Sequence, residues 1–152
     1  MILRVLGASS FDLEIQEIAA DKSISHRCAI FSLLSDKPSL IRNYLKGEDT
    51  LDSLNIAKRL GLEVREEGSE MVLTPPPNIQ EPRSILECGN AGTAIRLYLG
   101  LLSAQKGLFV LSGDCYLNRR PMKRVVLPLR SIGATILGRE DGNLAPLVVV
   151  GN

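Results

Sequence analysis

Apolar positions along the chain alternate between helical spacing and strand spacing. Apolar residues at helical spacing predict helices over 22–36, 48–61, 90–105 and 120–133. Short apolar runs bounded by glycine, proline or polar residues predict strands over 39–43, 62–67, 70–74, 84–88, 107–113, 134–140 and 145–151. Gly61 is typical of a helix end, and hairpin turns are expected at 68–69 and 141–143. Pro128 is expected to bend or divide the last helix.

This order of elements occurs twice. The segment PPPNIQEPR (75–83) is expected to be a linker, because three consecutive prolines disfavour both a helix and a central strand. AKRLGLEV in the first part parallels PLRSIGATI in the second, and Arg27 similarly corresponds to Arg96. We therefore predict an α/β (α+β) fold of two βαβαββ units, over about 1–74, with an N-terminal strand within 1–20, and about 84–152. Because each unit alone buries little, we expect their helices to pack together beneath the sheets.

Composition restricts the class of protein. The 152 residues carry a formal net charge of +1 and only 4% aromatic residues, so nothing in the bulk numbers favours nucleic acid or a membrane surface as partner. No apolar run is long enough to span a bilayer, and the start lacks the pattern of a signal peptide. Three distant cysteines without a CxxC pair argue against disulfides and a zinc site. We expect a cytoplasmic protein.

The first candidate site is DKSISHR, which contains the single histidine of the chain. Asp21 or Ser23 can cap the helix, and Lys22, Ser23 and Arg27 could converge on free backbone N–H groups to bind a phosphate or carboxylate. The alternative is an ordinary capped and solvated first turn. In a regular helix His26 points away from Ser23 and Arg27, so a structural role is favoured for it.

The second candidate site is ECGNAGTAIR (87–96). Gly89 and Gly92 allow close approach of a ligand to the backbone, Asn90 can cap the helix, and Thr93 and Arg96 lie one turn apart. The segment matches neither a Walker loop nor GxGxxG. A helix start with small residues for tight packing is an equally good interpretation.

The third candidate site is GDCYLNRRPMKR (113–124), which crowds four cations around a helix start with Pro121 at its first position. These cations are Arg119, Arg120, Lys123 and Arg124. They repel one another unless an anion or acids compensate, which favours a binding role over a solvated face. Cys115 follows a strand end, where a thiol could be exposed and reactive, or simply a small filler. All three sites lie where a helix begins, so their helix ends could point at one anionic ligand.

In this order and spacing, DKSISHR, GNAGTAIR and the RPM segment after GD resemble the N-terminal part of the EPSP synthase family of 3-phosphoshikimate 1-carboxyvinyltransferases. The resemblance covers nearly the whole chain, including KGEDTLDS and PLRSIGA. It implies the enolpyruvyl transferase fold, an inside-out α/β barrel in which βαβαββ units form two domains around a cleft. It also implies a transferase of the shikimate pathway of aromatic amino-acid biosynthesis.

The family transfers the enolpyruvyl group of phosphoenolpyruvate to the 5-hydroxyl of shikimate 3-phosphate and releases phosphate. Matching motifs imply that Lys22 contacts both substrates and that Ser23 and Arg27 hold shikimate 3-phosphate. They imply that the Gly92 backbone and Arg120 hold phosphoenolpyruvate. Three further residues would shape that pocket: Asn90, Thr93 and Arg96. The resemblance implies no metal or organic cofactor, two small anionic substrates as the only partners, and a monomeric parent enzyme.

Departures from the family pattern limit what the resemblance implies. Ala20 replaces the usual glycine, and Leu97 stands where many members have proline. Gly92 is the residue of glyphosate-sensitive members, so we expect the parent enzyme to be a glyphosate target. The family's second serine pair, catalytic carboxylate and lysine come later in its chain. We therefore expect a partial N-terminal domain that lacks the C-terminal domain, contains no catalytic residue that we can assign and is inactive alone.

Two alternatives remain at this stage. One is the sister enzyme that transfers enolpyruvate to UDP-N-acetylglucosamine and carries its reactive cysteine at the place of Cys115. Against it, that family has a lysine–asparagine pair where this chain has Lys22 and Ser23. The other alternative is a non-catalytic domain that binds anions or serves as a structural repeat.

Overall fold

Two sheets with helices between them make up the structure, a computed structural model that describes residues 3–4, 6–7, 10, 12, 14 and 18–151. The first unit contains α1 (Lys22–Ser32), β1 (Ser39–Arg42), α2 (Glu48–Arg59), β2 (Glu63–Glu67) and β3 (Glu70–Thr74). The second contains β4 (Leu86–Glu87), α3 (Gly92–Ser103), β5 (Gly107–Ser112), the 3-10 turn η1 (Leu117–Arg119), α4 (Lys123–Ser131), β6 (Thr135–Gly138), the short α5 (Arg139–Gly142) and β7 (Leu144–Gly151). The predicted strand within 1–20 lies largely outside the described residues.

The two sheets share one strand order. In the first sheet the order is β1-β3-β2, and in the second it is β4-β5-β7-β6, with every pair antiparallel except β4 with β5. The strands β5, β7 and β6 therefore correspond to β1, β3 and β2. This confirms the predicted α/β class. The second unit has the βαβαββ order, whereas the described residues of the first unit show αβαββ, so its leading strand and the exact bounds of the units stay a prediction.

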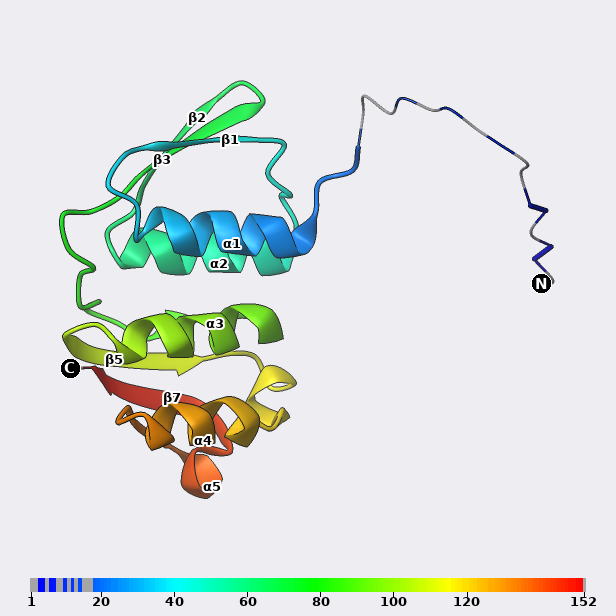
Figure 1. The fold of residues 1–152 in the computed structure, drawn as a ribbon. Coiled ribbons are helices and arrows are strands. Elements are labelled where there is room, and N and C mark those ends of the chain that lie inside the picture. The colour runs from blue at the N-terminus through cyan, green and yellow to red at the C-terminus, as the bar shows by residue number, and fades with distance from the viewer. Residues whose placement is uncertain are drawn as a thin grey trace.

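Three helices, α1, α2 and α3, form the layer between the sheets. In Figure 1, α1 and α2 lie under the first sheet, and α3 lies below them on the second sheet. Contacts join α2 to both α1 and α3, and α4 packs against α3 and β6. The buried apolar side chains of this layer include Ile56, Leu60, Ile95 and Leu99. Burial of such side chains supplies the main favourable free energy of folding. No helix among the described residues is long and apolar enough to cross a membrane.

Both units end their second helix in the same way. Gly61 after α2 has φ +106°, and Gly133 after α4 has φ +101°. Their N–H groups donate to the carbonyls of Lys58 and Arg130, each at 3.0 Å. A residue with a side chain is strained at such φ values, which explains why glycine stands at both positions. The parallel between AKRLGLEV and PLRSIGATI therefore reflects one repeated helix ending.

Some predicted boundaries were wrong. The first helix ends at Ser32, because Ser35 forms a local turn in which its hydroxyl accepts from the Lys37 N–H. The predicted strand 84–88 is paired only over Leu86–Glu87. The last helix begins at Lys123 rather than at 120, and Pro128 lies within it without dividing it.

A buried polar chain links the three central helices. His26 of α1 shares a hydrogen bond of 2.7 Å between its Nδ1 and the Oγ of Ser53 on α2. The hydroxyl of Tyr98 on α3 donates to the carbonyl oxygen of Ser53 at 2.7 Å. His26 is 1% exposed, and Ser53 and Tyr98 are fully buried. His26 therefore has a structural position, as its place on the helical wheel predicts.

Replacing His26 by glutamine is expected to reduce the pH dependence of stability. Burial, followed by the charge of Lys22, lowers the pKa of His26 below its ordinary 6.5, so the folded protein favours the neutral ring. The unfolded chain binds a proton more readily, so the free energy of unfolding falls as the pH drops below the unfolded pKa. Urea unfolding at about pH 7.5 and about pH 5.5 measures this loss. An equal loss in the wild type and H26Q would contradict the assignment.

Candidate anion-binding site

The helices α1, α2, α3 and α4 all begin at the same side of the molecule, the right-hand side of Figure 1. The first turn of a helix presents unpaired N–H groups and a partial positive charge. An open cavity of about 460 Å³ lies at this side and is lined by first-turn residues of α1, α2 and α3 and by the segments that precede α3 and α4. These residues are Lys22, Glu48, Asp49, Asn90, Gly92, Thr93, Arg96 and Arg120. We call this cavity the helix-start cavity.

Two guanidinium groups flank Gly92 in the cavity. Arg96 donates from Nη1 to the Gly92 carbonyl at 2.7 Å, and Arg120 donates from Nη2 to Oδ1 of Asn90. A Cβ atom added to Gly92 would lie 2.8 Å from Nη1 of Arg96 and 2.8 Å from Nη1 of Arg120. Glycine therefore stands at 92 because any side chain would push the two guanidinium groups aside.

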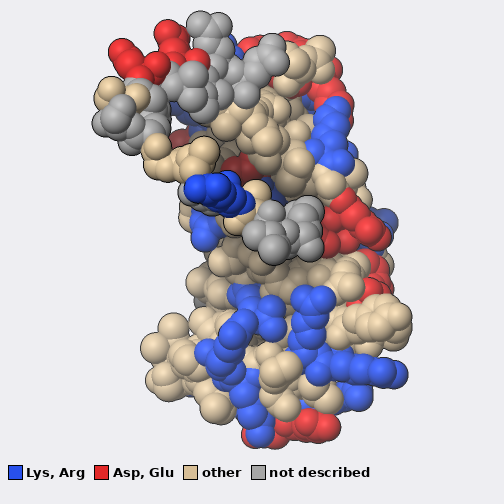
Figure 2. Space-filling view, turned by 90° about the vertical axis from the view of Figure 1, so that its right-hand side faces the viewer, with Lys and Arg blue, Asp and Glu red and all other residues tan. Residues whose placement is uncertain are grey.

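Around the start of α3 the arginine side chains are not balanced by acidic residues of the same helix turn. Burial, followed by the nearby charges of Arg124 and Arg120, lowers the pKa of Arg96. Its Nε is buried with no hydrogen-bond partner among the described residues. The first turn of α3 contains no acidic residue. Figure 2, which faces this side, shows Lys and Arg side chains gathered over the second unit. A bound anion would reduce the repulsion among the arginines and accept hydrogen bonds from their remaining N–H groups.

Two acids of α2 line the opposite side of the cavity. Lys22 forms an ion pair with Asp49, and Glu48 lies next to Asp49 in the first turn of α2. The sequence analysis missed both acids as site residues. The available signal was KGED at the start of a predicted helix, at the same kind of junction as the three basic motifs. Acids in a first helical turn are common for reasons of helix stability alone, so this signal was weak.

The prediction that Asn90 caps a helix was wrong, although the residue does line the cavity. It does not cap α3, whose N-cap residue is Ala91; instead its side-chain oxygen accepts from Arg120. Gly89 before it has φ +51°, and a Cβ there would overlap the carboxylate of Asp52. Burial, followed by the charges of Glu48 and Asp49, raises the pKa of Asp52. The loop 88–91 is thus held between α2 and Arg120.

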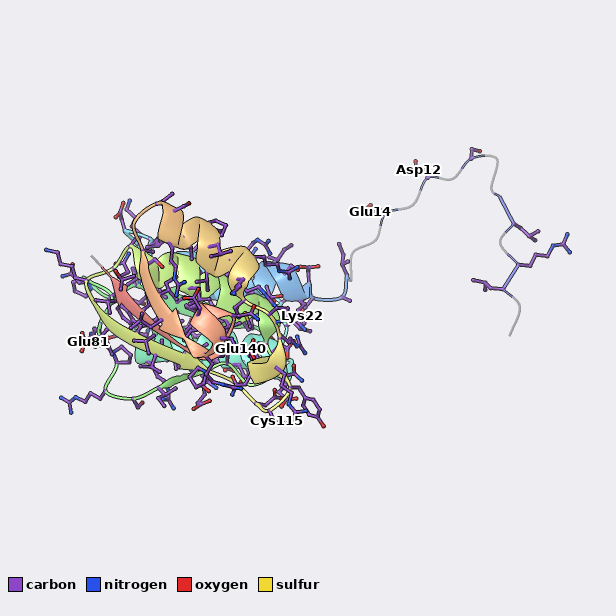
Figure 3. The ribbon with its side chains drawn as sticks, turned by 90° about the horizontal axis from the view of Figure 1, so that it is seen from below. Asp12, Glu14, Lys22, Glu81, Cys115 and Glu140 are labelled. Carbon is purple, nitrogen blue, oxygen red and sulfur yellow. The ribbon has the colours of Figure 1, made fainter. Side chains whose placement is uncertain are left out.

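The structure places the other predicted residues outside the cavity lining. Ser23 and Arg27 are exposed on α1, and Arg27 donates to the Ser23 carbonyl at 2.9 Å. Arg27 also lines an apolar groove between α1 and α3. Asp21, not Ser23, caps α1, accepting from the N–H of Ile24 at 2.7 Å. Cys115 is exposed at the same end of the molecule as Lys22 (Figure 3) but does not line the cavity.

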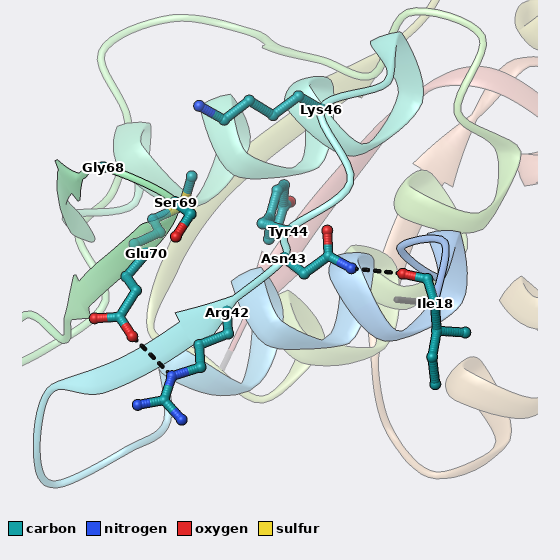
Figure 4. A pocket seen from close by; sticks show the side chains of 9 residues that line it. Ile18, Arg42, Asn43, Tyr44, Lys46, Gly68, Ser69 and Glu70 are labelled. Carbon is teal, nitrogen blue, oxygen red and sulfur yellow. Dashed lines mark hydrogen bonds and ion pairs between the residues drawn. The ribbon is translucent and has the colours of Figure 1, made fainter. Parts of the chain in front are cut away.

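A larger cavity of about 700 Å³ lies beside β1 and the β2–β3 turn (Figure 4). Its charged groups already have partners. Arg42 Nε contacts Glu70 Oε1 at 2.7 Å, and Lys46 Nζ contacts Glu66 Oε2 at 2.5 Å. Asn43 donates to the Ile18 carbonyl at 2.9 Å. The helix-start cavity is the better candidate for an anion, because its guanidinium groups have no acidic partner in the part of the chain that the structure describes. No cluster of His, Cys, Asp and Glu that could hold a metal ion occurs among the described residues.

Comparison with known proteins gives the family. A family model described as EPSP synthase (3-phosphoshikimate 1-carboxyvinyltransferase) matches residues 8–152. The chain belongs to this family. A 3-phosphoshikimate 1-carboxyvinyltransferase of Wolinella succinogenes is 66% identical over 142 residues, which are 93% of this chain and 32% of the relative. One of Campylobacter curvus is 58% identical over 151 residues, which are 99% of this chain and 35% of the relative.

A solved structure gives the same result. EPSP synthase from Acinetobacter baumannii superposes with a TM-score of 0.84 at 33% identity, over 89% of this chain and 31% of that chain. The enolpyruvyl transferase fold implied by the sequence motifs is therefore confirmed. The family match also decides between the two enolpyruvyl transferase alternatives, in favour of EPSP synthase. The chain spans about a third of the length of the curated relatives that it matches.

Replacing Gly92 by alanine is expected to weaken the binding of inorganic phosphate about ten-fold, the cost of one displaced charge-assisted hydrogen bond. The added Cβ would displace the guanidinium groups of Arg96 and Arg120. Isothermal titration calorimetry measures the affinity. Gly100→Ala is the matched control, because it changes the same helix where no atom lies within 4 Å of an added Cβ. G100A should keep the wild-type affinity and raise the free energy of unfolding by about 0.5–1 kcal/mol. Equal affinities for G92A and G100A would contradict the site.

Proposed function

We propose that this chain forms one wall of the substrate site of a 3-phosphoshikimate 1-carboxyvinyltransferase. In this reaction the enolpyruvyl group of phosphoenolpyruvate passes to the 5-hydroxyl of shikimate 3-phosphate and phosphate leaves. The observation that carries the proposal is the pair of guanidinium groups of Arg96 and Arg120 around Gly92, at the start of a helix whose first turn contains no acidic residue. Such an arrangement suits a ligand that has several negative charges.

Phosphoenolpyruvate is the substrate for the α3 side of the cavity. Its carboxylate is planar and its phosphate is tetrahedral. A guanidinium group can bind either one through two parallel hydrogen bonds. Arg120 would supply such a group, held in place by Asn90, and the backbone at Gly92 would come within contact distance because no side chain intervenes. Thr93 and Arg96 would complete the pocket. These donors would stabilise the charge that develops as phosphate leaves.

Shikimate 3-phosphate is the substrate for the α1 side. Lys22 lies at the boundary and would reach both substrates. Ser23 and Arg27 are exposed on the same helix and free to meet a ligand from the solvent side. Arg27 donates to the Ser23 carbonyl, a weak neutral acceptor that a phosphate oxygen would replace. The assignment therefore requires Arg27 to change its partner when the ligand binds.

We also propose the partners, cellular location and cofactor needs of the parent enzyme. The substrates are the only partners that we assign, in a cytoplasmic and monomeric parent enzyme that needs no metal or organic cofactor. We assign no catalytic acid or base within these residues. The described acids that line the cavity are Glu48 and Asp49; Asp49 is paired with Lys22, and both would balance part of the positive charge.

Replacing Arg120 by glutamine is expected to weaken the binding of phosphoenolpyruvate at least ten-fold when shikimate 3-phosphate is present. The change removes a charged fork from the cavity, and a hydrogen bond to a charged group contributes about 1.5–3 kcal/mol. Calorimetric titration measures the affinity. Arg119→Gln is the control, because Arg119 is exposed next to Arg120 and does not line the cavity. Similar affinities in R120Q and R119Q would count against the proposal.

The 152-residue chain is expected to bind shikimate 3-phosphate more tightly than UDP-N-acetylglucosamine and to release no phosphate from the two substrates. Amide shifts at Ser23 and Arg27 in an NMR titration should be local and saturable. A phosphate-release assay tests turnover. Tighter binding of the sugar nucleotide, or measurable turnover, would refute the corresponding part of the proposal. Weak, dispersed shifts with every anion would instead favour a non-catalytic anion-binding domain.

A further inference from the structure

Lys22 occupies an unfavourable position for a cation. It is the first residue of α1, where the partial charge of the helix end is positive. The N-cap Asp21 is engaged with the N–H of Ile24. The first turn of α1 contains no acidic residue, and the ion-pair partner of Lys22 comes from another helix.

That partner is Asp49, in the first turn of α2. Its Oδ2 contacts Nζ of Lys22 across the two helix starts, and both side chains line the helix-start cavity. Asp49 is favourably placed with respect to the positive end of its own helix, because an anion in the first turn is stabilised there. The ion pair is half open to solvent, with side-chain exposures of 54% for Lys22 and 27% for Asp49. A pair of this kind is readily exchanged for another.

We propose that Asp49 is an internal counter-ion that competes with anionic ligands for Lys22 and so sets which anions the cavity retains. The inference rests on the proposed function, in which Lys22 touches the substrates. A small anion held by Arg120 leaves the ion pair intact, so it gains no contact with Lys22 as long as Asp49 is present. A ligand with a second anionic group reaches Lys22 and replaces the carboxylate of Asp49. Asp49 thereby lowers the affinity for simple inorganic anions more than the affinity for a ligand with several anionic groups.

The neighbouring acid provides an internal comparison. Glu48 lines the same cavity, one residue from Asp49, but forms no ion pair with Lys22 in the structure. Removing either charge changes the net charge of the cavity equally. Only removal of the charge on Asp49 frees Lys22. The difference in phosphate affinity between Asp49→Asn and Glu48→Gln therefore separates the effect of the ion pair from the effect of the net charge of the cavity.

The experiment measures the affinity of inorganic phosphate by calorimetry for the wild type, D49N, E48Q, K22Q and the double variant K22Q/D49N. We expect D49N to bind phosphate about five-fold more tightly than the wild type and E48Q less than two-fold more tightly, in keeping with the strength of exposed ion pairs. In the K22Q background the effect of D49N should fall to that of E48Q, as a double-mutant cycle requires for a direct pair. D49N should raise the affinity for phosphoenolpyruvate, measured in the presence of shikimate 3-phosphate, by a smaller factor than the affinity for phosphate.

Two results would overturn the inference. D49N could bind phosphate no more tightly than E48Q, or more weakly than the wild type, in which case Asp49 positions Lys22 instead of competing for it. Asp49→Ser retains a residue favoured near helix starts and replaces D49N if that variant is unstable. If the wild type binds no phosphate and R120Q changes nothing, the proposed function itself fails. If the wild type binds and only the D49N effect is missing, the inference alone fails.

Discussion

The site depends on the way in which α1, α2 and α3 pack against one another. Ser53 joins these helices through His26 on one side and Tyr98 on the other, with both hydrogen bonds buried. Buried polar groups must find their partners, so this chain permits few alternative arrangements of the three helices. The packing brings the starts of all three helices to one cavity. Lys22, the acids of α2 and the loop before α3 meet there only because the helices are held in this arrangement.

The repeat explains why similar arginines occur in both units. Arg27 and Arg96 each donate to the carbonyl four residues earlier in their helix, from Ser23 and Gly92 respectively. The local structure is therefore the same in both. The difference is the residue at the helix start, because serine retains a side chain whereas glycine leaves room for the guanidinium of Arg120. The repeated scaffold thus places its arginines in two different surroundings through a single small residue at each helix start.

The charges of the cavity are unequally divided between the units. The second unit contributes arginines that repel one another, and the first contributes a lysine that is paired with an acid. In the proposed function, the arginine side would attract any anion, while the lysine side would bind only an anion that competes with Asp49. In the proposed function, this division would let the cavity distinguish two substrates that both have several charges. It also limits the electrostatic cost of keeping so many cations together.

The sequence by itself determined the element order, the repeat, the helix endings at Gly61 and Gly133 and the family, because these depend on local periodicity, backbone conformation and motif spacing. It indicated Lys22, Asn90, Gly92 and Arg120 as neighbours of a ligand, and all four line one cavity. The tertiary structure alone decided which side chains are partners. Asn90 binds Arg120 instead of capping α3, and Asp49 binds Lys22, from residues far apart in the chain. Such pairs depend on the packing of separate helices, and that packing is set by buried contacts that no local pattern records.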